Sequence, residues 1–321
     1  MNAQKLSRRT ALSRTGAVVG AALASEFVNA VPAAPAAPAA KTREPFLFCL
    51  NTATIRGQKL GLVKEIEVAA QAGYRGIEPW ISSIEEYAKS GGSLKEARKR
   101  LEDLGLSMES AIGFAEWLVD DDARRAKAIE RARYELDLVA QLGGKRLAAP
   151  PAGATAVAGL DLLQAAERYR ALLELGGQAG VVPQLELWGF SKSLFRLGQC
   201  VGAAMETGHP KACVLADVYH LYKGGSEWRG LKLLGPNTVQ VLHMNDYPSD
   251  PPRDKINDSF RVYPGDGSAP LTDILRVLAA TGGQKVLSLE VFNRKYWEQD
   301  ALEVARAGLE KMKAAAAKAL A

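Results

Sequence analysis

The feature that most constrains the fold is an alternation, repeated eight times after residue 43, of a short apolar run and a longer stretch of helical periodicity. Several short runs are apolar on both faces, as in Val214-Leu215-Ala216, which is typical of parallel strands covered by helices. Eight such units predict an α/β fold, a single-domain (β/α)8 TIM barrel. The predicted strands are 46–50, 76–78, 107–112, 146–149, 182–187, 213–217, 239–244 and 286–291.

Four of the helical stretches end directly before a glycine. The stretches 60–72, 94–104, 122–142 and 160–179 are followed by Gly73, Gly105, Gly143 and Gly180. Glycine is the expected residue just past a last helical turn, because that position often needs a left-handed backbone. The alternative is a doubly wound open sheet, but no GxGxxG or GxxxxGK[ST] motif follows the first run. The nucleotide-binding form of that fold therefore has little support.

The first 43 residues have the layout of an export signal. Arg8 and Arg9 precede a short apolar stretch, 16–24, and an Ala/Pro-rich stretch, 31–40, follows. The adjacent arginines resemble a twin-arginine signal, although Ala11 stands where that pattern usually has a large apolar residue. We therefore expect 1–43 to be a signal and linker, 44–321 to be the catalytic barrel, and the protein to be exported to the periplasm or the medium.

Charge and cysteine content exclude several classes of protein. Residues 44–321 contain 35 basic and 35 acidic side chains, so the expected barrel has no net charge. A neutral domain argues against a nucleic-acid partner. The apolar stretch in the signal is too short to be a stable membrane anchor. The three cysteines lack CxxC spacing, which argues against a zinc knuckle or a disulfide scaffold.

Metal-capable side chains lie at the ends of the last four predicted strands. They are Glu186, Asp217, His243 and Glu290. Active sites of TIM barrels are built at the C-terminal strand ends, so these side chains should converge at one mouth. Three carboxylates without a basic partner would repel one another unless a cation lay among them. We therefore expect one divalent ion, with Mn²⁺ or Mg²⁺ best suited to these ligands and Co²⁺ or Zn²⁺ also acceptable.

With these residues in place, the chain from 46 to 320 resembles the xylose-isomerase-like superfamily of TIM barrels, which includes the sugar phosphate isomerases and epimerases. The resemblance is most specific at Glu186, 217–220, 243–246, 261–267 and Glu290. It implies that Glu186, Asp217, His243 and Glu290 hold the metal and that both glutamates move protons. It also implies that His220 and Arg261 contact the substrate.

Two departures from the family pattern matter for function. The segment 247–260 is long and charged where a shorter connection is usual. We expect 247–264 to lie over the barrel mouth and bring Arg261 to the substrate. The superfamily also contains endonuclease IV, which needs histidines on the early strands for three zinc ions. This chain has only three histidines in all, so DNA repair is disfavoured.

Further candidates for substrate binding follow the earlier strands. Trp80, Trp117 and Trp188 could each lie against the apolar face of a sugar ring, although aromatic packing of the loops would explain them equally well. Glu78 and Glu116 could bind sugar hydroxyls, with helix capping or loop salt bridges as the alternative. The expected substrate-binding residues are therefore His220, Arg261, Glu78, Trp117 and Trp188.

These observations predict a divalent-metal-dependent sugar isomerase or epimerase that abstracts a proton next to a carbonyl. The same first step can end in loss of a leaving group. A lyase or dehydratase acting on keto-sugars or 3-keto-glycosides is therefore the alternative, and a non-catalytic sugar-binding barrel is a third reading. The expected partner is a small sugar, and a homo-oligomer is left open.

Overall fold

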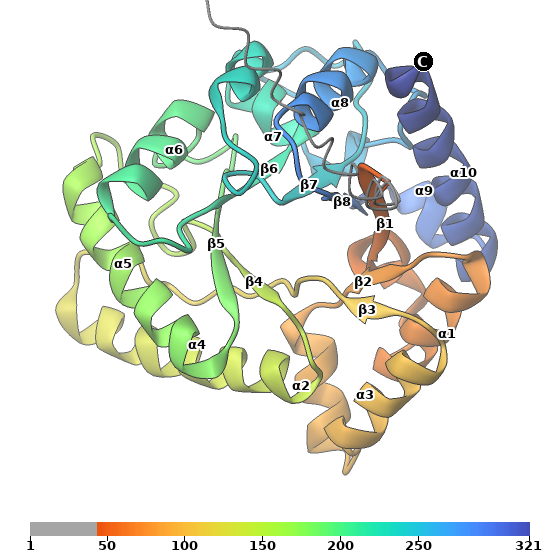
Figure 1. Ribbon diagram of the computed structural model, residues 1–321, viewed down its shortest axis with the longest axis horizontal. Coiled ribbons are helices and arrows are strands. Elements are labelled where there is room, and N and C mark those ends of the chain that lie inside the picture. The colour runs from red at the N-terminus through yellow and green to blue at the C-terminus, as the bar shows by residue number, and fades with distance from the viewer. Residues whose placement is uncertain (1–43) are drawn as a thin grey trace, which may run out of the picture. The chain divides into compact units, whose positions relative to one another are not determined.

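The computed structural model describes residues 44–321, which form an eight-stranded parallel barrel (Figure 1). The strand order is β3-β2-β1-β8-β7-β6-β5-β4. Backbone bonds from the N–H groups of Ala111 and Ala148 to the carbonyls of Arg146 and Ala111 join the remaining two strands and close the ring. The strands are β1 Phe46–Asn51, β2 Gly76–Glu78, β3 Ser107–Met108, β4 Arg146–Ala149, β5 Val182–Glu186, β6 Val214–Asp217, β7 Val241–Met244 and β8 Lys285–Leu289.

Helices form the outer ring around these strands, as the view in Figure 1 shows. The longest are α4, α5 and α10, which lie on either side of the barrel. The helices are α1 Leu62–Ala72, α2 Ile81–Lys89, α3 Leu94–Asp103, α4 Asp122–Gln141, α5 Leu162–Ala179, α6 Leu197–Glu206, α7 Val218–Lys223, α8 Leu271–Ala280, α9 Arg294–Trp297 and α10 Ala301–Leu320, with 3-10 turns η1 Thr52–Gln58, η2 Trp228–Leu233 and η3 Asp258–Phe260.

The hydrophobic core has two parts, and the polar site residues lie beyond both of them at the C-terminal mouth of the barrel. The larger part lies between the strands and the helices, and a smaller one fills the barrel interior. The interior cluster consists of Cys49, Ile112, Ala148, Leu215, Val241 and Val286. All three cysteines are buried and unpaired among the described residues. Because these side chains plug the barrel, the polar residues beyond the strand ends have an apolar floor beneath them.

The eightfold strand–helix pattern expected from the sequence is confirmed, with shifts at the element ends. Gly73 and Gly180 follow their helices with φ of 97° and 72°, the left-handed backbone that favours glycine. The third strand is shorter than expected and ends at Met108, because the chain beyond it keeps only scattered backbone bonds to its neighbours. Helix α2 was not among the stretches that the periodicity singled out.

The expected export signal, residues 1–43, lies outside the described residues, and so do the domain boundary and the localisation that depend on it. Among the helices of residues 44–321, none is both long enough and apolar enough to cross a membrane.

Candidate active site

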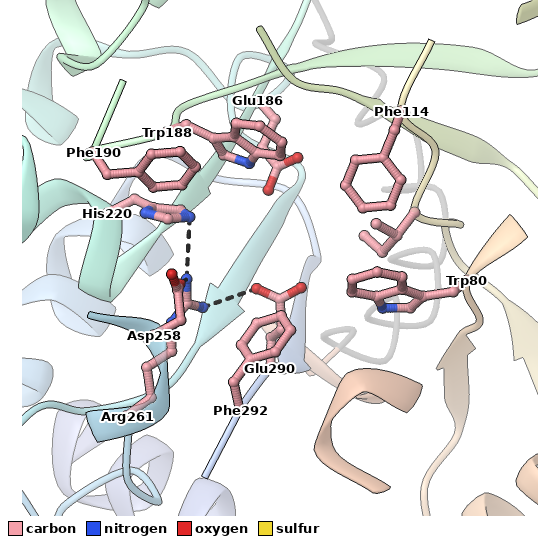
Figure 2. Close-up of a pocket in the computed structure, with 11 residues that line it drawn as sticks. Trp80, Phe114, Glu186, Trp188, Phe190, His220, Asp258, Arg261, Glu290 and Phe292 are labelled. Carbon is pink, nitrogen blue, oxygen red and sulfur yellow. Dashed lines mark hydrogen bonds and ion pairs between the residues drawn. The ribbon is translucent and has the colours of Figure 1, made fainter. Parts of the chain in front are cut away.

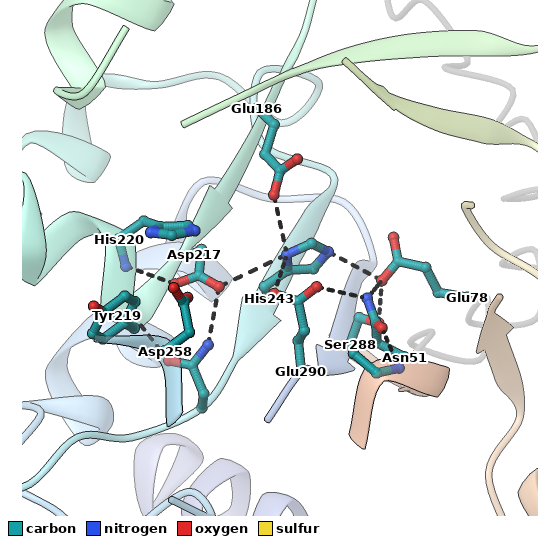
Figure 3. Close-up of polar contacts among 12 residues, drawn as sticks. Asn51, Glu78, Glu186, Asp217, Tyr219, His220, His243, Asp258, Ser288 and Glu290 are labelled. Atoms are coloured by element: carbon teal, nitrogen blue, oxygen red, sulfur yellow. Dashed lines mark hydrogen bonds and ion pairs between the residues drawn. The ribbon is translucent and has the colours of Figure 1, made fainter. Parts of the chain in front are cut away.

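Four neighbouring strands bring the metal-capable side chains together. Strands β5, β6, β7 and β8 are consecutive in the barrel, and their register sets Asp217 beside His243 and His243 beside Ser288. Glu186 is the last residue of β5, and Glu290 directly follows β8. Since all strands are parallel, these ends face one mouth, and the four side chains point inward to one place (Figure 3).

The Nδ1 atom of His243 is the centre of this group. It lies 3.2 Å from Oε2 of Glu290 and 3.7 Å from both Oδ2 of Asp217 and Oε1 of Glu186. Asp217, His243 and Glu290 each offer a ligand atom, and these atoms lie within 4.8 Å of one another. All four side chains are buried. Two carboxylates and one imidazole nitrogen therefore form a compact group, and Glu186 lies beside it, 3.7 Å from Nδ1 of His243.

The polar atoms left without partners fit a bound cation at that point. Nδ1 of His243 and Oε2 of Glu186 are buried and accept no hydrogen bond from any described residue. Burial, with the Glu290 and Asp217 carboxylates nearby, raises the pKa of Glu186 to about 8. Although burial opposes it, the Glu290 and Glu78 carboxylates raise the pKa of His243. Oxygen ligands with one imidazole nitrogen form a donor set that divalent metals accept.

The other face of the His243 ring is held by Glu78. Nε2 of His243 lies 3.1 Å from Oε2 of Glu78, which also accepts hydrogen bonds from Ser288 Oγ at 2.6 Å and Asn51 Nδ2 at 3.0 Å (Figure 3). Burial alone would raise the pKa of Glu78, but the neighbouring His243 lowers it. An ionised carboxylate can only accept, so Nε2 carries a proton and Nδ1 is the atom free to coordinate.

Arg261 links the carboxylates to the loop after β7. Its Nη1 donates to Asp217 Oδ2 and Glu290 Oε2, each at 2.9 Å. Its Nη2 donates to Asp258 at 2.5 Å and lies 3.1 Å from Nε2 of His220 (Figure 2). Arg261 is thus the basic partner that the sequence pattern did not reveal. Oε2 of Glu290 keeps a lone pair for a metal ion, whereas Oδ2 of Asp217 also accepts a hydrogen bond from Asn245 at 3.0 Å.

The protonation of His220 follows from its contact with Arg261. A guanidinium can only donate, so Nε2 of His220 accepts and Nδ1 carries the proton when the ring is neutral. Burial, aided by the charge of Arg261, lowers the pKa of His220 to about 3. His220 is therefore a neutral side chain on the cavity wall.

Asp246 anchors the loop that carries Arg261. Its backbone exchanges hydrogen bonds with Val262, and its carboxylate accepts from the N–H groups of Gly265, Gly267 and Ala269. These bonds fix the turn that follows Arg261. They explain how a side chain on a long connection is held with only 1% of its surface exposed.

The cavity above the carboxylates is walled mainly by aromatic rings (Figure 2). Its acidic members are Glu186, Asp258 and Glu290, and its basic member is Arg261. The other lining residues are Trp80, Ile112, Phe114, Trp188, Phe190, His220 and Phe292. The cavity thus includes the two expected proton-moving glutamates, together with Trp188, His220 and Arg261 from the expected substrate-binding set.

Two of the expected substrate-binding residues do not line the cavity. Glu78 lies beneath it and contacts His243, as described above. Trp117 is 1% exposed, donates its indole N–H to the Pro150 carbonyl at 2.8 Å and packs against Tyr169. Its ring therefore belongs to the core rather than to the rim. Glu116 pairs with Arg124 on the surface, as the salt-bridge alternative predicted.

Sequence reasoning missed several residues of the site. Asp258 reaches the cavity from near the end of the long loop, where no local pattern marks it. Phe114, Phe190 and Phe292 were also overlooked. A signal existed for two of them, because Phe190 and Phe292 stand two positions beyond Trp188 and Glu290. Residues two apart on an extended chain share a face.

The chain belongs to the xylose isomerase-like TIM barrel family, whose model matches residues 66–315. It is 26% identical over 235 residues to a 3-dehydroshikimate dehydratase of Pseudomonas putida. The matched region covers 72% of this chain and 36% of that protein. The chain thus spans about a third of the length of the dehydratases it matches. It is 24% identical over 280 residues to an inosose isomerase of Bacillus velezensis, covering 84% and 97% of the two chains.

The solved structures agree on the fold. The crystal structure of the IOLI protein with a bound zinc atom superimposes with a TM-score of 0.77 at 21% identity, covering 85% of this chain and 98% of that one. The names of these relatives are consistent with an enzyme of the sugar isomerase/epimerase type.

Proposed function

We propose that this protein is a divalent-metal-dependent enzyme that abstracts a proton next to the carbonyl of a sugar-like substrate and thereby isomerises or epimerises it. The observation that carries the proposal is the convergence of Glu186, Asp217 and Glu290 on Nδ1 of His243, at distances of 3.2–3.7 Å. The resemblance to inosose isomerases supports the reaction class.

The ligand side chains fix the geometry of the reaction. When bound, a divalent ion would polarise the substrate carbonyl and stabilise the negative charge that develops on its oxygen. Asp217 is held by the backbone N–H of His220 at 2.7 Å and by Asn245 at 3.0 Å. His243 is held by Glu78 from the opposite side. Asp217 and His243 are thus held in place by neighbouring groups, which suits them to hold the ion.

The two glutamates differ in their surroundings. Glu290 accepts hydrogen bonds through both oxygens, from Asn51 at 3.1 Å and from Arg261 at 2.9 Å. Glu186 keeps one buried oxygen free of any described partner. A carboxylate with a free oxygen and a raised pKa is suited to take a proton. We therefore assign proton abstraction to Glu186, with Glu290 facing it across the floor of the cavity (Figure 2).

Elimination is the second candidate reaction. The same proton abstraction, followed by loss of a β-substituent, would make the protein a dehydratase or lyase. The match to 3-dehydroshikimate dehydratases over 72% of the chain favours this outcome. Because those enzymes are longer than this chain, we include their substrate only as one of the candidates to be tested.

Exchange in D₂O tests the proposal and separates its outcomes. The metal-loaded protein is incubated with D-fructose, an inosose, a 3-keto-glucoside and 3-dehydroshikimate. Deuterium uptake with an isomeric product indicates isomerisation, and loss of a substituent indicates elimination. Asp217→Ala and His243→Ala should lose both the metal and the activity. Full turnover by protein stripped with a chelator and checked by elemental analysis would refute the metal mechanism.

A further inference from the structure

A glutamate followed two positions later by an aromatic residue occurs at the ends of three strands. The pairs are Glu78 and Trp80 at β2, Glu186 and Trp188 at β5, and Glu290 and Phe292 at β8. Residues two apart on an extended chain share a face and stand about 6–7 Å apart along it. Each aromatic ring is thus placed one step nearer the mouth than its carboxylate, and all three rings line the cavity.

These rings and two phenylalanines form a continuous aromatic arc. The ring centroids are 6.1 Å apart between Phe292 and Trp80, 5.1 Å between Trp80 and Phe114, 6.1 Å between Phe114 and Trp188, and 5.1 Å between Trp188 and Phe190. Figure 2 shows the arc around the carboxylates. Phe114 and Phe190 are 41% and 48% exposed, so both rings present apolar surface to solvent beside the cavity.

The charges of the cavity disfavour an anionic substrate. Among the described residues that line it, Arg261 is the only cationic side chain, and its guanidinium is already bonded to Asp217, Glu290 and Asp258. Arg56 covers the Trp80 ring at 4.2 Å but does not line the cavity. A phosphate or carboxylate placed away from the proposed metal ion would meet Asp258, and none of the described lining residues offers a free cation to pair with it.

We infer that the substrate is an uncharged glycoside of two linked rings. The keto-bearing ring lies over the carboxylates, and the second ring stacks on Phe114 and Phe190. This inference rests on the proposed function for the inner ring. The outer ring is assigned by the aromatic arc, because Phe114 and Phe190 flank Trp188 and each keeps an exposed face that a second ring can cover. Either a sugar or an aryl group offers the flat apolar face that such stacking requires.

Calorimetric titration of the Mn²⁺-loaded protein tests the outer ring. The single-ring probe is methyl 3-keto-glucoside, and the two-ring probes are phenyl 3-keto-glucoside and 3-keto-cellobiose. We expect at least one two-ring probe to bind about tenfold more tightly than the single-ring probe, the order of one stacked aromatic contact. The aryl and glucosyl arms show which second ring is preferred. A 3-keto-glucose 6-phosphate should bind more weakly than the methyl glucoside.

Variants connect the preference to the arc. Phe114→Ala and Phe190→Ala should each reduce the two-ring preference several-fold, and Phe190→Trp should restore it. Tyr134→Ala removes a comparably exposed aromatic from helix α4 and should leave the preference unchanged. Equal affinities for one-ring and two-ring probes would overturn the inference, even if the protein exchanges deuterium. A two-ring preference without exchange would support the binding site and refute the proposed reaction instead.

Discussion

Nε2 of His243 lies 3.1 Å from Oε2 of Glu78, although 165 positions separate the two residues in the chain. The contact turns Nδ1 of His243 toward the carboxylates, where it is the proposed coordinating atom. Glu78, which we first expected at the substrate, thus positions a proposed ligand instead. A carboxylate behind a ligating histidine orients the ring and raises its basicity.

Glu78→Gln should weaken metal binding. Loss of the negative charge behind His243 is expected to lower metal affinity by about 10–100-fold, measured by competition with a chromophoric chelator. Glu109→Gln is the matched control, because Glu109 is also buried but pairs with Lys145 and Arg146 at the start of β4. Equal metal affinities for both variants and the wild type would show that Glu78 does not position His243.

Glu186→Gln and Glu290→Gln should reduce turnover much more than substrate binding. Each change keeps the side-chain shape and removes a basic oxygen, so kcat at saturating metal should fall by about 10²–10⁴-fold. Rates of deuterium exchange measure the effect, and elemental analysis confirms the metal content. If Glu186→Gln retained normal exchange, the proton-abstracting group would have to be sought elsewhere.

Arg261→Ala should make the fold depend more strongly on the metal. Without the guanidinium, Asp217 and Glu290 lie buried and unpaired in the metal-free protein, at a cost of about 3–5 kcal/mol. Bound metal should recover much of this loss, so the rise in Tm on adding metal should exceed that of the wild type. Arg170→Ala breaks an exposed pair with Glu174 and serves as the control. Arg261→Ala, unlike this control, should also use substrate poorly.

Glu65→Gln should stabilise the protein at alkaline pH. Burial raises the pKa of Glu65 from 4.5 to about 7. Between these values the folded chain holds a proton that the unfolded chain has lost, so the wild type loses stability as pH rises through this window. The loss is at most about 3 kcal/mol. Glutamine removes it, and urea titrations should show a gain at pH 8 that is several times the gain at pH 5. Glu310→Gln, at an exposed position, should show no such dependence.

Export is a proposal that rests on residues outside the described structure. Replacing Arg8 and Arg9 with lysine should trap precursor in the cytoplasm, because the paired arginines are the proposed signal. The mature chain should begin between about residues 25 and 44, where the expected linker ends. Fractionation and N-terminal sequencing test this. Exported protein that still starts at Met1 would contradict it.

Local patterns were sufficient for the barrel and for the positions of the expected metal ligands. The sequence of a strand such as 213–217 shows which residue is at its C-terminal end. In a parallel barrel all C-terminal strand ends lie at the same mouth. Asp217 and His243 could therefore be expected to meet without knowledge of the intervening loops. The glycines after the helices could also be predicted from local sequence, because the left-handed backbone that they supply is required by the last helical turn and not by distant contacts.

The roles of Glu78, Trp117 and Asp258 were decided only by the tertiary structure. Glu78 is the last residue of its strand just as Glu186 is, yet β1 and β8 separate β2 from β7, so its carboxylate reaches the back of His243. Trp117 stands on an irregular segment whose direction no periodicity sets. Asp258 depends on how a long loop folds back under Asp246. In each case the partner is distant in sequence, and the contact depends on packing that a single stretch of residues does not encode.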